Sequence, residues 1–404
     1  MTDQDAVPPG YKRTEIGVIP EDWKVLPIGK ICTLHNGRAY ALHEWETMGV
    51  PVIRLQNITG GSDYYYSNLI LSEQKYCDCG DLLYMWSATF GPYIWKGGKA
   101  IYHYHIWKVS PNNEITDQLF LYYKLGEITE GMKKRASNGG TMLHITKESM
   151  ESRLLLLPPL PEQHAIAAAL SDADGLIGAL DALIAKKRDM KQAAMQQLLT
   201  GRTRLPGFEG EWGNYPLNAF VRNFIVPMRD KPKKFTGDIP WCRIEDFDGI
   251  YLNDSKSGQY VDKEIIQEMN LKVYPKGTLL VSCSADLGRC TIVSRPLVSN
   301  QTFIGLEMDD SISNCLFFYY YMTSQSMRLN NLSSGTTISY LSREQFEEFE
   351  VQIPSDYEEQ TAIATVLSDM DAEIAALKRR RDKVKEIKQG MMQQLLTGKV
   401  RLAC

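Results

Sequence analysis

Residues 162–205 read EQHAIAAALSDADGLIGALDALIAKKRDMKQAAMQQLLTGRTRL, and residues 359–402 read EQTAIATVLSDMDAEIAALKRRRDKVKEIKQGMMQQLLTGKVRL. The two segments align without a gap at an offset of 197 positions, and 24 of the 44 aligned residues are identical. One structural unit is therefore used twice in this chain, and the rest of the sequence is organised around the two copies.

Each copy has the apolar spacing of a long α-helix. Apolar residues recur at intervals of four and three, the heptad spacing of a helix that packs along its length against another helix. Cations enter the spacing late in each copy, where we expect the pairing to loosen or a partner to intrude. Pro161 and a Ser355-x-x-Glu358 capping box are start signals, and Gly201 and Gly398 stand where a left-handed C-terminal residue is expected. About 38 helical residues at about 1.5 Å each predict a length of about 57 Å. The spaced positions are Ile166, Leu170, Ala173, Ile177, Leu180, Ile184, Lys187, Lys191, Ala194 and Leu198, then Ile363, Leu367, Met370, Ile374, Leu377, Arg381, Val384, Lys388, Met391 and Leu395.

Length and composition indicate an ordinary globular protein. The 404 residues allow two or three domains, and no apolar run approaches the roughly 18 residues of a membrane helix. The segment from Met1 to Gly10 is polar and acidic, unlike a signal peptide, so we expect a cytoplasmic protein. A net charge of −4 argues against a protein that holds nucleic acid alone, but it permits one that reads DNA while partners hold the backbone. Of the eight cysteines only Cys77-x-Cys79 forms a close pair, which predicts reduced thiols and no zinc site.

The repeat extends beyond the long helices. A lead-in from Pro9 to Trp23 precedes the first globule, and a similar one from Pro206 to Trp212 precedes the second. From these tryptophans the halves share an offset of 189, which aligns Arg54 with Arg243; further on, the offset returns to 197. The segment after the first helix ends in Arg204-Leu205 and continues into the second lead-in, and the segment after the second helix ends in the same way, in Arg401-Leu402. The N-terminal lead-in therefore corresponds to the continuation that Arg401-Leu402 lacks, and we expect the two ends of the chain to lie close together.

Each globule is predicted to mix strands and helices. The apolar runs after Gly80 and Gly277 are typical of a buried strand that enters a tight turn. The other expected elements are strands at Ile101–Val109 and Gln301–Glu307, helices near Asp117–Lys134 and Ser313–Leu329, and polar loops at Ser137–His144 and Ser333–Tyr340.

Catalytic signatures are missing from the sequence. It has no Walker loop, no Gly-x-Ser-x-Gly elbow and no Asn/Asp-Pro-Pro-aromatic motif of amino-methyltransferases. His103 and His105 alternate along an expected strand, where satisfied strand histidines are favoured over a metal site. Trp86, Trp95 and Trp107 are expected in the core more than as stacking surfaces for bases. The sequence thus predicts no catalytic, cofactor-binding or metal-binding residue.

Candidate DNA contacts are the polar loops, the two Ser-Ala turns and nearby cations. Small hydroxyl and amide residues around glycines let the chain approach phosphates and base edges closely. The predicted contacts are Arg54, Ser87, Thr89, Lys133, Lys134, Arg135, Ser137, Asn138, Thr141, His144, Lys231, Lys233, Lys234, Arg243, Ser282, Ser284, Arg289, Ser334, Thr336, Thr337, Ser339 and Tyr340.

The order of these parts resembles the specificity subunit of type I restriction-modification systems. The resemblance rests on the sequence Pro-Pro-Leu-Pro-Glu-Gln at 158–163, the Gln-Gln-Leu-Leu-Thr-Gly ends of both helices, and the lead-ins at 19–23 and 208–212. It covers nearly the whole chain.

The second copy departs from this pattern in two places. Residues 353–358 lack the double proline, and Arg379-Arg380-Arg381 replaces the apolar Ala182-Leu183-Ile184 of the first copy. These departures leave open whether both helices dock partners equally.

The resemblance implies an α+β fold. Two mixed α/β target recognition domains would be joined by two long helices that form an antiparallel coiled coil, in a pseudo-two-fold, circular arrangement. The implied parts are a first recognition domain with its lead-in at 1–157, a spacer helix at 158–205, a second recognition domain at 206–353 and a second spacer helix at 354–404.

The resemblance also implies a non-catalytic function. The chain would read a bipartite, asymmetric site in double-stranded DNA and would scaffold two methyltransferase subunits and the restriction subunits, with no membrane partner. No cofactor is expected on this chain, whereas S-adenosylmethionine, ATP and Mg are expected on the partner subunits. The alternative is a recognition fragment of a single-chain methyltransferase-nuclease, which would show a fused rather than separate methyltransferase reading frame upstream.

Overall fold

The structure, a computed structural model, describes residues 7–87, 89–136, 145–226, 231–284, 286–332 and 340–402. The chain divides into two compact units. Unit 1 comprises Met1–Asp181 with Arg380–Cys404, and unit 2 comprises Ala182–Arg379. Each unit therefore contains one globule together with a part of each long helix.

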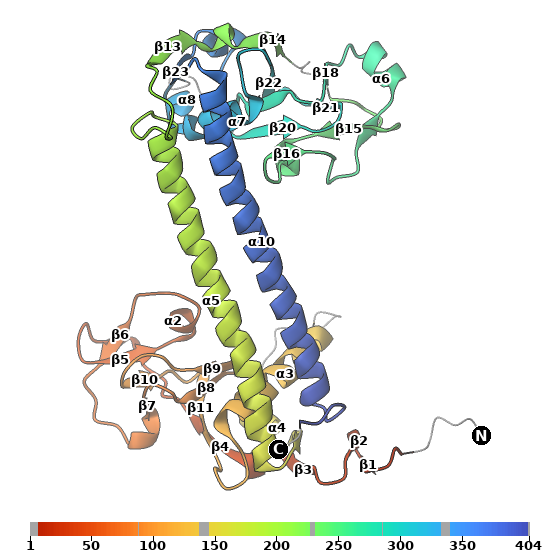
Figure 1. The fold of residues 1–404 in the computed structure, drawn as a ribbon. Coiled ribbons are helices and arrows are strands. Elements are labelled where there is room, and N and C mark those ends of the chain that lie inside the picture. Colours follow the sequence, from red (N-terminus) through yellow and green to blue (C-terminus); the bar gives the residue numbers. More distant parts are fainter. Residues whose placement is uncertain are drawn as a thin grey trace. The chain divides into compact units, whose positions relative to one another are not determined.

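The two repeated segments form the long helices predicted from their spacing. They are α5 (Leu160–Leu198) and α10 (Tyr357–Leu395), each of 39 residues (Figure 1). Gly201 has a φ of +67° and Gly398 a φ of +72°, which confirms the left-handed residue after each helix.

The predicted capping box of the second helix is wrong. Helix α10 begins at Tyr357, and the side chain of Asp356 accepts a hydrogen bond from the backbone N–H of Glu358 at 2.9 Å. Asp356 directly precedes the first helical residue and so stands at the N-cap, which Ser355 precedes by one position.

About half of the apolar heptad positions are buried within their unit, and the others are half-buried. Leu170 and Ile184 of α5 and Leu367 and Ile374 of α10 are all less than 7% exposed. The two helices therefore bury one stripe each, which supplies most of the stability of helices of this length.

The lysines of the heptad spacing form ion pairs between the helices, so the expected loosening of the pairing is wrong, whereas the intrusion of a partner stays a prediction. In unit 1 the Lys388 ammonium contacts the Asp174 carboxylate at 2.6 Å, and in unit 2 Lys191 contacts Asp371 at 2.6 Å. The helices run antiparallel within each unit, so each late lysine lies opposite an early aspartate of the other helix. Further pairs are Arg381–Asp181 in unit 1 and Lys187–Glu373 in unit 2.

The globule of unit 1 is built on two four-stranded sheets. Their strand orders are β4-β11-β8-β9 and β6-β5-β10-β7, and β10 pairs parallel to β5. The elements are β1 (Tyr11–Thr14), β2 (Gly17–Pro20), β3 (Lys24–Pro27), α1 (Ile28–Ile31), β4 (Cys32–Asn36), η2 (Leu42–Glu44), β5 (Val50–Ile53), α2 (Leu55–Ile58), β6 (Tyr65–Ser67), η3 (Glu73–Lys75), β7 (Tyr76–Cys77), β8 (Leu82–Met85), β9 (Gly91–Ile94), β10 (Ala100–Tyr102), β11 (Ile106–Pro111), α3 (Gln118–Ala136), α4 (Lys147–Glu151) and β12 (Leu154–Leu157).

The globule of unit 2 repeats this plan. Its sheets have the orders β14-β22-β19-β20-β16 and β17-β15-β21-β18, and β21 pairs parallel to β15. The elements are β13 (Trp212–Pro216), η4 (Leu217–Ala219), β14 (Val221–Ile225), β15 (Ile239–Cys242), η5 (Ile244–Asp246), β16 (Tyr251–Leu252), β17 (Tyr260–Val261), α6 (Lys263–Glu268), β18 (Val273–Tyr274), β19 (Leu279–Ser282), β20 (Cys290–Val293), β21 (Leu297–Ser299), β22 (Phe303–Met308), α7 (Cys315–Ser324), α8 (Ser326–Leu332), α9 (Arg343–Glu347) and β23 (Glu350–Pro354).

The apolar run after Gly80 forms a strand with a core on each side, which explains its lack of polar alternation. Leu82 and Tyr84 of β8 lie in the hydrophobic cluster that includes residues of α3, whereas Leu83 and Met85 lie in the cluster that includes residues of β10. Successive side chains of a strand point to opposite faces, so both faces must be apolar here. Strand β19 of unit 2 divides its residues between two clusters in the same way.

Two predicted elements are interrupted in the structure. The strand expected at 101–109 is two strands, β10 and β11, separated by a turn at 103–105, so the expectation that His103 and His105 alternate along a strand is wrong. The helix expected at 313–329 is broken into α7 and α8 at Gln325. Trp95 and Trp107 are buried as predicted, while Trp86 is half-buried.

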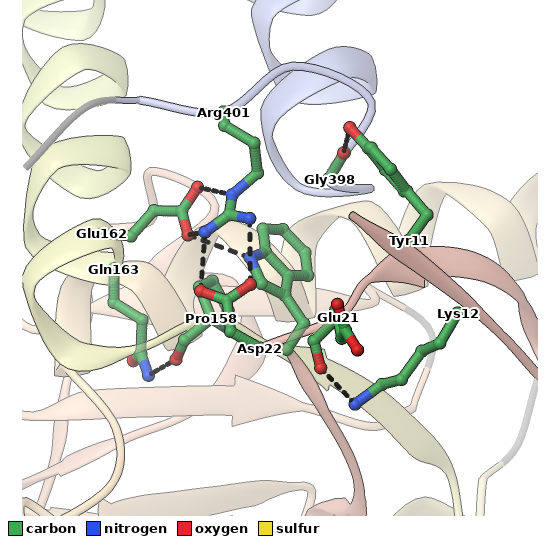
Figure 2. A network of polar contacts seen from close by, with 10 residues as sticks. Tyr11, Lys12, Glu21, Asp22, Pro158, Glu162, Gln163, Gly398 and Arg401 are labelled. Carbon is green, nitrogen blue, oxygen red and sulfur yellow. Dashed lines mark hydrogen bonds and ion pairs between the residues drawn. The ribbon is translucent and has the colours of Figure 1, made fainter. Parts of the chain in front are cut away.

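The described segments nearest the two ends of the chain meet in unit 1, as the repeat predicts. The Tyr11 hydroxyl donates a hydrogen bond to the carbonyl of Gly398 at 3.1 Å. The Arg401 guanidinium donates to the carboxylates of Glu162 at 2.6 Å and Asp22 at 2.9 Å (Figure 2). The N-terminal lead-in is therefore attached to the segment that follows α10.

The internal junction of unit 2 has the equivalent contacts. Trp212 is the counterpart of Trp23, whose indole N–H donates to Glu162 at 2.9 Å. The Arg204 guanidinium donates to Glu359 at 2.6 Å, and the indole N–H of Trp212 points to the same carboxylate at 3.4 Å. One arginine, one buried glutamate and one tryptophan thus join lead-in and helix in both units.

Candidate nucleic-acid interface

Arg54 lies between β5 and α2 in unit 1. It follows β5, and its backbone N–H donates to Asn57 Oδ1 at 2.9 Å, which starts the short helix α2. The guanidinium carbon lies 5.1 Å from the ring centroid of Tyr65 and 5.8 Å from that of Trp45. Within the described residues this guanidinium makes no hydrogen bond or ion pair. Aromatic rings hold it while its N–H donors stay available for a guanine edge or a phosphate.

Arg243 occupies the equivalent place in unit 2. It follows β15, and its backbone N–H donates to Asp246 Oδ2 at 2.6 Å. Its guanidinium carbon lies 5.8 Å from the Trp241 ring centroid, and the ammonium of Lys231 lies 5.8 Å from the same centroid. Glu245 approaches the guanidinium at 3.9 Å and partly offsets its charge.

The Ser-Ala turn and the end of the polar loop come together in unit 2. Ser284 forms an isolated β-bridge with Tyr340, and the Leu341 N–H donates to the carbonyl of Cys283 at 2.9 Å. Ser282 is fully buried, and its hydroxyl donates to the carbonyl of Ser284 at 2.7 Å. The Ser282 side chain therefore belongs to the interior, and its prediction as a DNA contact is wrong.

The remaining predicted cations differ in how far they are engaged. Lys133, Lys134 and Arg135 are exposed on the last turn of α3, where the helix dipole favours cations, and Lys133 pairs with Glu130 at 3.0 Å. Arg289 contacts Asp286 and the carbonyl of Phe247. Lys233, Lys234 and Thr89 are exposed, and Ser87 is half-buried.

Eight predicted contacts lie outside the described residues. They are Ser137, Asn138, Thr141, His144, Ser334, Thr336, Thr337 and Ser339.

Two long segments of the chain, residues 20–186 and 226–386, match the family model described as the type I restriction modification DNA specificity domain. The chain belongs to this family. The two matched segments correspond to the two halves of the internal repeat.

Relatives in the specificity family match along the chain. The putative type I restriction enzyme MjaX specificity subunit of Methanocaldococcus jannaschii is 26% identical, and the alignment covers 97% of each chain. The EcoBI specificity subunit of Escherichia coli is 23% identical over 77% of this chain and 71% of its own.

Solved structures show the same fold. The type I restriction-modification S subunit from M. genitalium superposes with a TM-score of 0.59 at 15% identity, covering 98% of this chain and 99% of that chain. A chain from work on complex assembly and conformational transition of the type I R-M system superposes with a TM-score of 0.62 at 17% identity, covering 95% and 99%. The α+β fold with two long paired helices is therefore that of the specificity family.

Further features of this family member concern metals and membranes. In the part of the chain that the structure describes, no group of three or more His, Cys, Asp or Glu side chains is placed to hold a metal ion. No described helix is long and apolar enough to cross a bilayer. The described cysteines are free thiols, and burial raises the pKa of Cys32 and Cys283 to about 12.

Sequence reasoning missed the aromatic rings beside the arginines. The pairing of β5 with β6 brings Tyr65 to Arg54, and Trp45, beside the Glu46–Tyr66 bridge, lies against the Tyr65 ring. No sequence spacing reveals these contacts. The sequence signal that could have found this site is the alignment of Arg54 with Arg243 in the internal repeat. Both arginines follow a strand, and each lies near an aromatic ring.

Proposed function

We propose that this chain is the DNA specificity subunit of a type I restriction-modification complex. Each globule reads one half of a bipartite, asymmetric site in double-stranded DNA. The chain also scaffolds two methyltransferase subunits and the restriction subunits, which carry S-adenosylmethionine, ATP and Mg. The chain itself is non-catalytic and acts where DNA is, in the cytoplasm.

One observation carries this proposal. Arg54 and Arg243 stand at the same register position of the same fold, each over an aromatic ring, yet their surroundings differ in charge and shape. A repeated frame with unlike polar surfaces is suited to read two unlike half-sites. The relative that matches along 97% of both chains is named a putative type I restriction enzyme specificity subunit, which favours this role over a fragment of a single-chain methyltransferase-nuclease.

Partners must supply most of the DNA affinity. The net charge of the chain is −4, and affinity for the DNA backbone depends on cations that release counterions. The methyltransferase subunits are therefore expected to hold the backbone while this chain selects the sequence.

The test is co-expression with methyltransferase subunits of a type I system in cells that lack DNA methylation. Sequencing of modified bases should show methylation at one bipartite recognition sequence when this chain is present and no methylation when it is omitted. Methylation that does not depend on the chain, or that follows a word fixed by the methyltransferase subunits alone, would refute the proposal.

A further inference from the structure

Two short turns occupy equivalent places in the two globules. Residues 103–105 connect β10 to β11, and residues 300–302 connect β21 to β22. The offset between them is that of the internal repeat, 197 positions. In unit 1 the turn follows β10, which pairs in parallel with β5, the strand that precedes Arg54. In unit 2 the turn follows β21, which pairs in parallel with β15, the strand that precedes Arg243.

In unit 1 this register brings the turn beside Arg54. Tyr102 of β10 lies opposite Ile53 of β5. The backbone N–H of the next residue, His103, donates to the carbonyl of Ile53 at 2.9 Å. Residues 103 and 54 are therefore neighbours at the same edge of the sheet.

In unit 2 the same register holds. Ser299 of β21 lies opposite Cys242 of β15, so Asn300 and Arg243 are the next residues on their strands. The position of the turn relative to the arginine is thus a property of the repeated fold.

Each turn is also attached to the Ser-Ala turn of its globule. The backbone N–H of Trp86 donates to the carbonyl of His105 at 3.2 Å, and the backbone N–H of Cys283 donates to the carbonyl of Thr302 at 2.8 Å. In both units the donor directly precedes the serine that the sequence predicts as a DNA contact. Three separate segments therefore converge at one place on each globule.

The exposure of side chains is the same in both turns. The middle residue, Tyr104 or Gln301, is exposed, and its two neighbours are half-buried. Tyr104 keeps 40% of its surface exposed.

The chemistry differs at all three positions. In unit 1 the Tyr104 ring centroid lies 4.4 Å from that of His103 and 3.8 Å from that of His105. Burial, with the nearby charges of His105 and Arg54, lowers the pKa of His103 to about 4, so this imidazole is neutral and offers one donor and one acceptor. The first turn is thus an aromatic surface that includes the neutral imidazole of His103.

In unit 2 the turn presents amides. The Thr302 hydroxyl donates to Asn300 Oδ1 at 2.6 Å, which fixes that side chain. The Gln301 amide makes no hydrogen bond to any residue that the structure describes. An amide offers a donor and an acceptor at the spacing of the adenine N7 and N6 groups in the major groove.

We infer that the turns at 103–105 and 300–302 contact base edges and determine the two half-sites, with the Gln301 amide recognising adenine. This inference rests on the proposed function, because it requires DNA as the ligand. The shared position and exposure come from the fold, whereas the differing side chains supply the difference in sequence preference.

The test compares Gln301→Ala with Gln267→Ala in the complete complex with methyltransferase subunits. Gln267 is an exposed glutamine on α6 of the same globule and is the matched control. Methylation of a DNA library with randomised half-sites should show that Gln301→Ala reduces the preference for adenine at one position of one half-site by about tenfold, with the other half-site unchanged. Gln267→Ala should leave both half-sites as in the wild type.

A second variant tests the first turn. Tyr104→Ala should change the preference only in the half-site that Gln301→Ala leaves unchanged. Thermal unfolding and co-purification with the methyltransferase subunits show whether each variant folds and assembles; if Tyr104→Ala does not, Tyr104→Phe replaces it.

The outcomes separate the two proposals. A wild-type complex without sequence preference would refute the proposed function itself. A selective wild type combined with an unchanged word in both folded variants would overturn only the inference. An equal loss of methylation on all sequences would also overturn it, since that result indicates phosphate contacts alone.

Discussion

Lys388 and Asp174 form an ion pair at 2.6 Å between the two long helices, and Lys191 and Asp371 form the same pair in the other unit. In each case a tyrosine of the globule donates a hydrogen bond to the same aspartate at 2.8 Å, Tyr123 in unit 1 and Tyr320 in unit 2. The lysine ammonium lies 5.1 Å from the centroid of that tyrosine ring in both units. One polar contact therefore ties together both helices and the globule, and it occurs twice.

Asp371→Asn should lower the free energy of unfolding by about 1 kcal/mol, because it leaves a half-buried lysine without its counter-charge while the amide oxygen can still accept from Tyr320. Urea denaturation measures the loss. Asp369→Asn, at an exposed position of the same helix, is the matched control and should change stability little. Combining Asp371→Asn with Lys191→Met should cost less than the sum of the two changes; simple additivity would show that the pair does not interact.

Arg401→Ala should destabilise unit 1 by about 2 kcal/mol. The change leaves the Glu162 carboxylate, which is only 3% exposed, with the Trp23 indole as its remaining partner. Arg202→Ala is the matched control, since Arg202 is exposed next to the equivalent junction of unit 2. Adding Glu162→Gln to Arg401→Ala should restore part of the loss, and a failure to do so would show that the charge of Glu162 is not the cause.

The effect of Arg401→Ala should also depend on pH. Hydrogen bonds from Arg401 lower the pKa of Asp22 in the folded protein below its unfolded value of about 3.9. Asp22 therefore contributes stability above about pH 4 and loses that contribution as the pH falls through the lowered pKa. The difference in stability between wild type and variant should shrink below pH 4; a difference that grows on acidification would contradict the assignment.

The contact between Tyr11 and Gly398 predicts that the chain tolerates circular permutation. New termini between Leu205 and Gly207, with Leu402 linked to Pro9 by a few flexible residues, should give a protein that assembles with the methyltransferase subunits and methylates the wild-type word. A permuted chain that folds but does not bind them would show that the ends do not meet as in unit 1.

Replacing Lys133, Lys134 and Arg135 by alanine should weaken DNA binding by the complete complex equally on all sequences. These cations are exposed at the end of α3, where phosphate contacts are expected to add affinity without sequence information. The slope of log affinity against log salt should fall by up to about 3. A change in the preferred DNA sequence would instead indicate base contacts. The isolated chain should bind DNA weakly with or without the replacements.

The long helices and the buried strands could be predicted because their signals are local. Heptad spacing predicts the side of α5 and α10 that carries buried residues such as Leu170 and Leu367, and an apolar run such as 82–85 requires a core on each side. The closeness of the chain ends followed from the repeat, since Arg401 repeats Arg204 and the lead-ins repeat each other.

The details of the candidate interface could not be predicted because they depend on register between distant segments. Lysines late in the heptad spacing predict a looser pairing or the intrusion of a partner, but Asp371 and Asp174 come opposite Lys191 and Lys388 only in the antiparallel register. The alternation of His103 and His105 resembles a strand in sequence, while the structure places a turn there beside Arg54. The burial of Ser282 likewise depends on the sheet that surrounds β19.

The proposed function requires that each of the two unlike globules reads one half-site. The most direct measurement is methylation, by the complete complex, of DNA carrying the two half-sites with the distance between them varied one base pair at a time. We expect methylation at one spacing, with sharp loss when one base pair is added or removed, because the geometry of a protein that reads both half-sites sets the distance between them. Equal methylation at every spacing, or of either half-site alone, would contradict it.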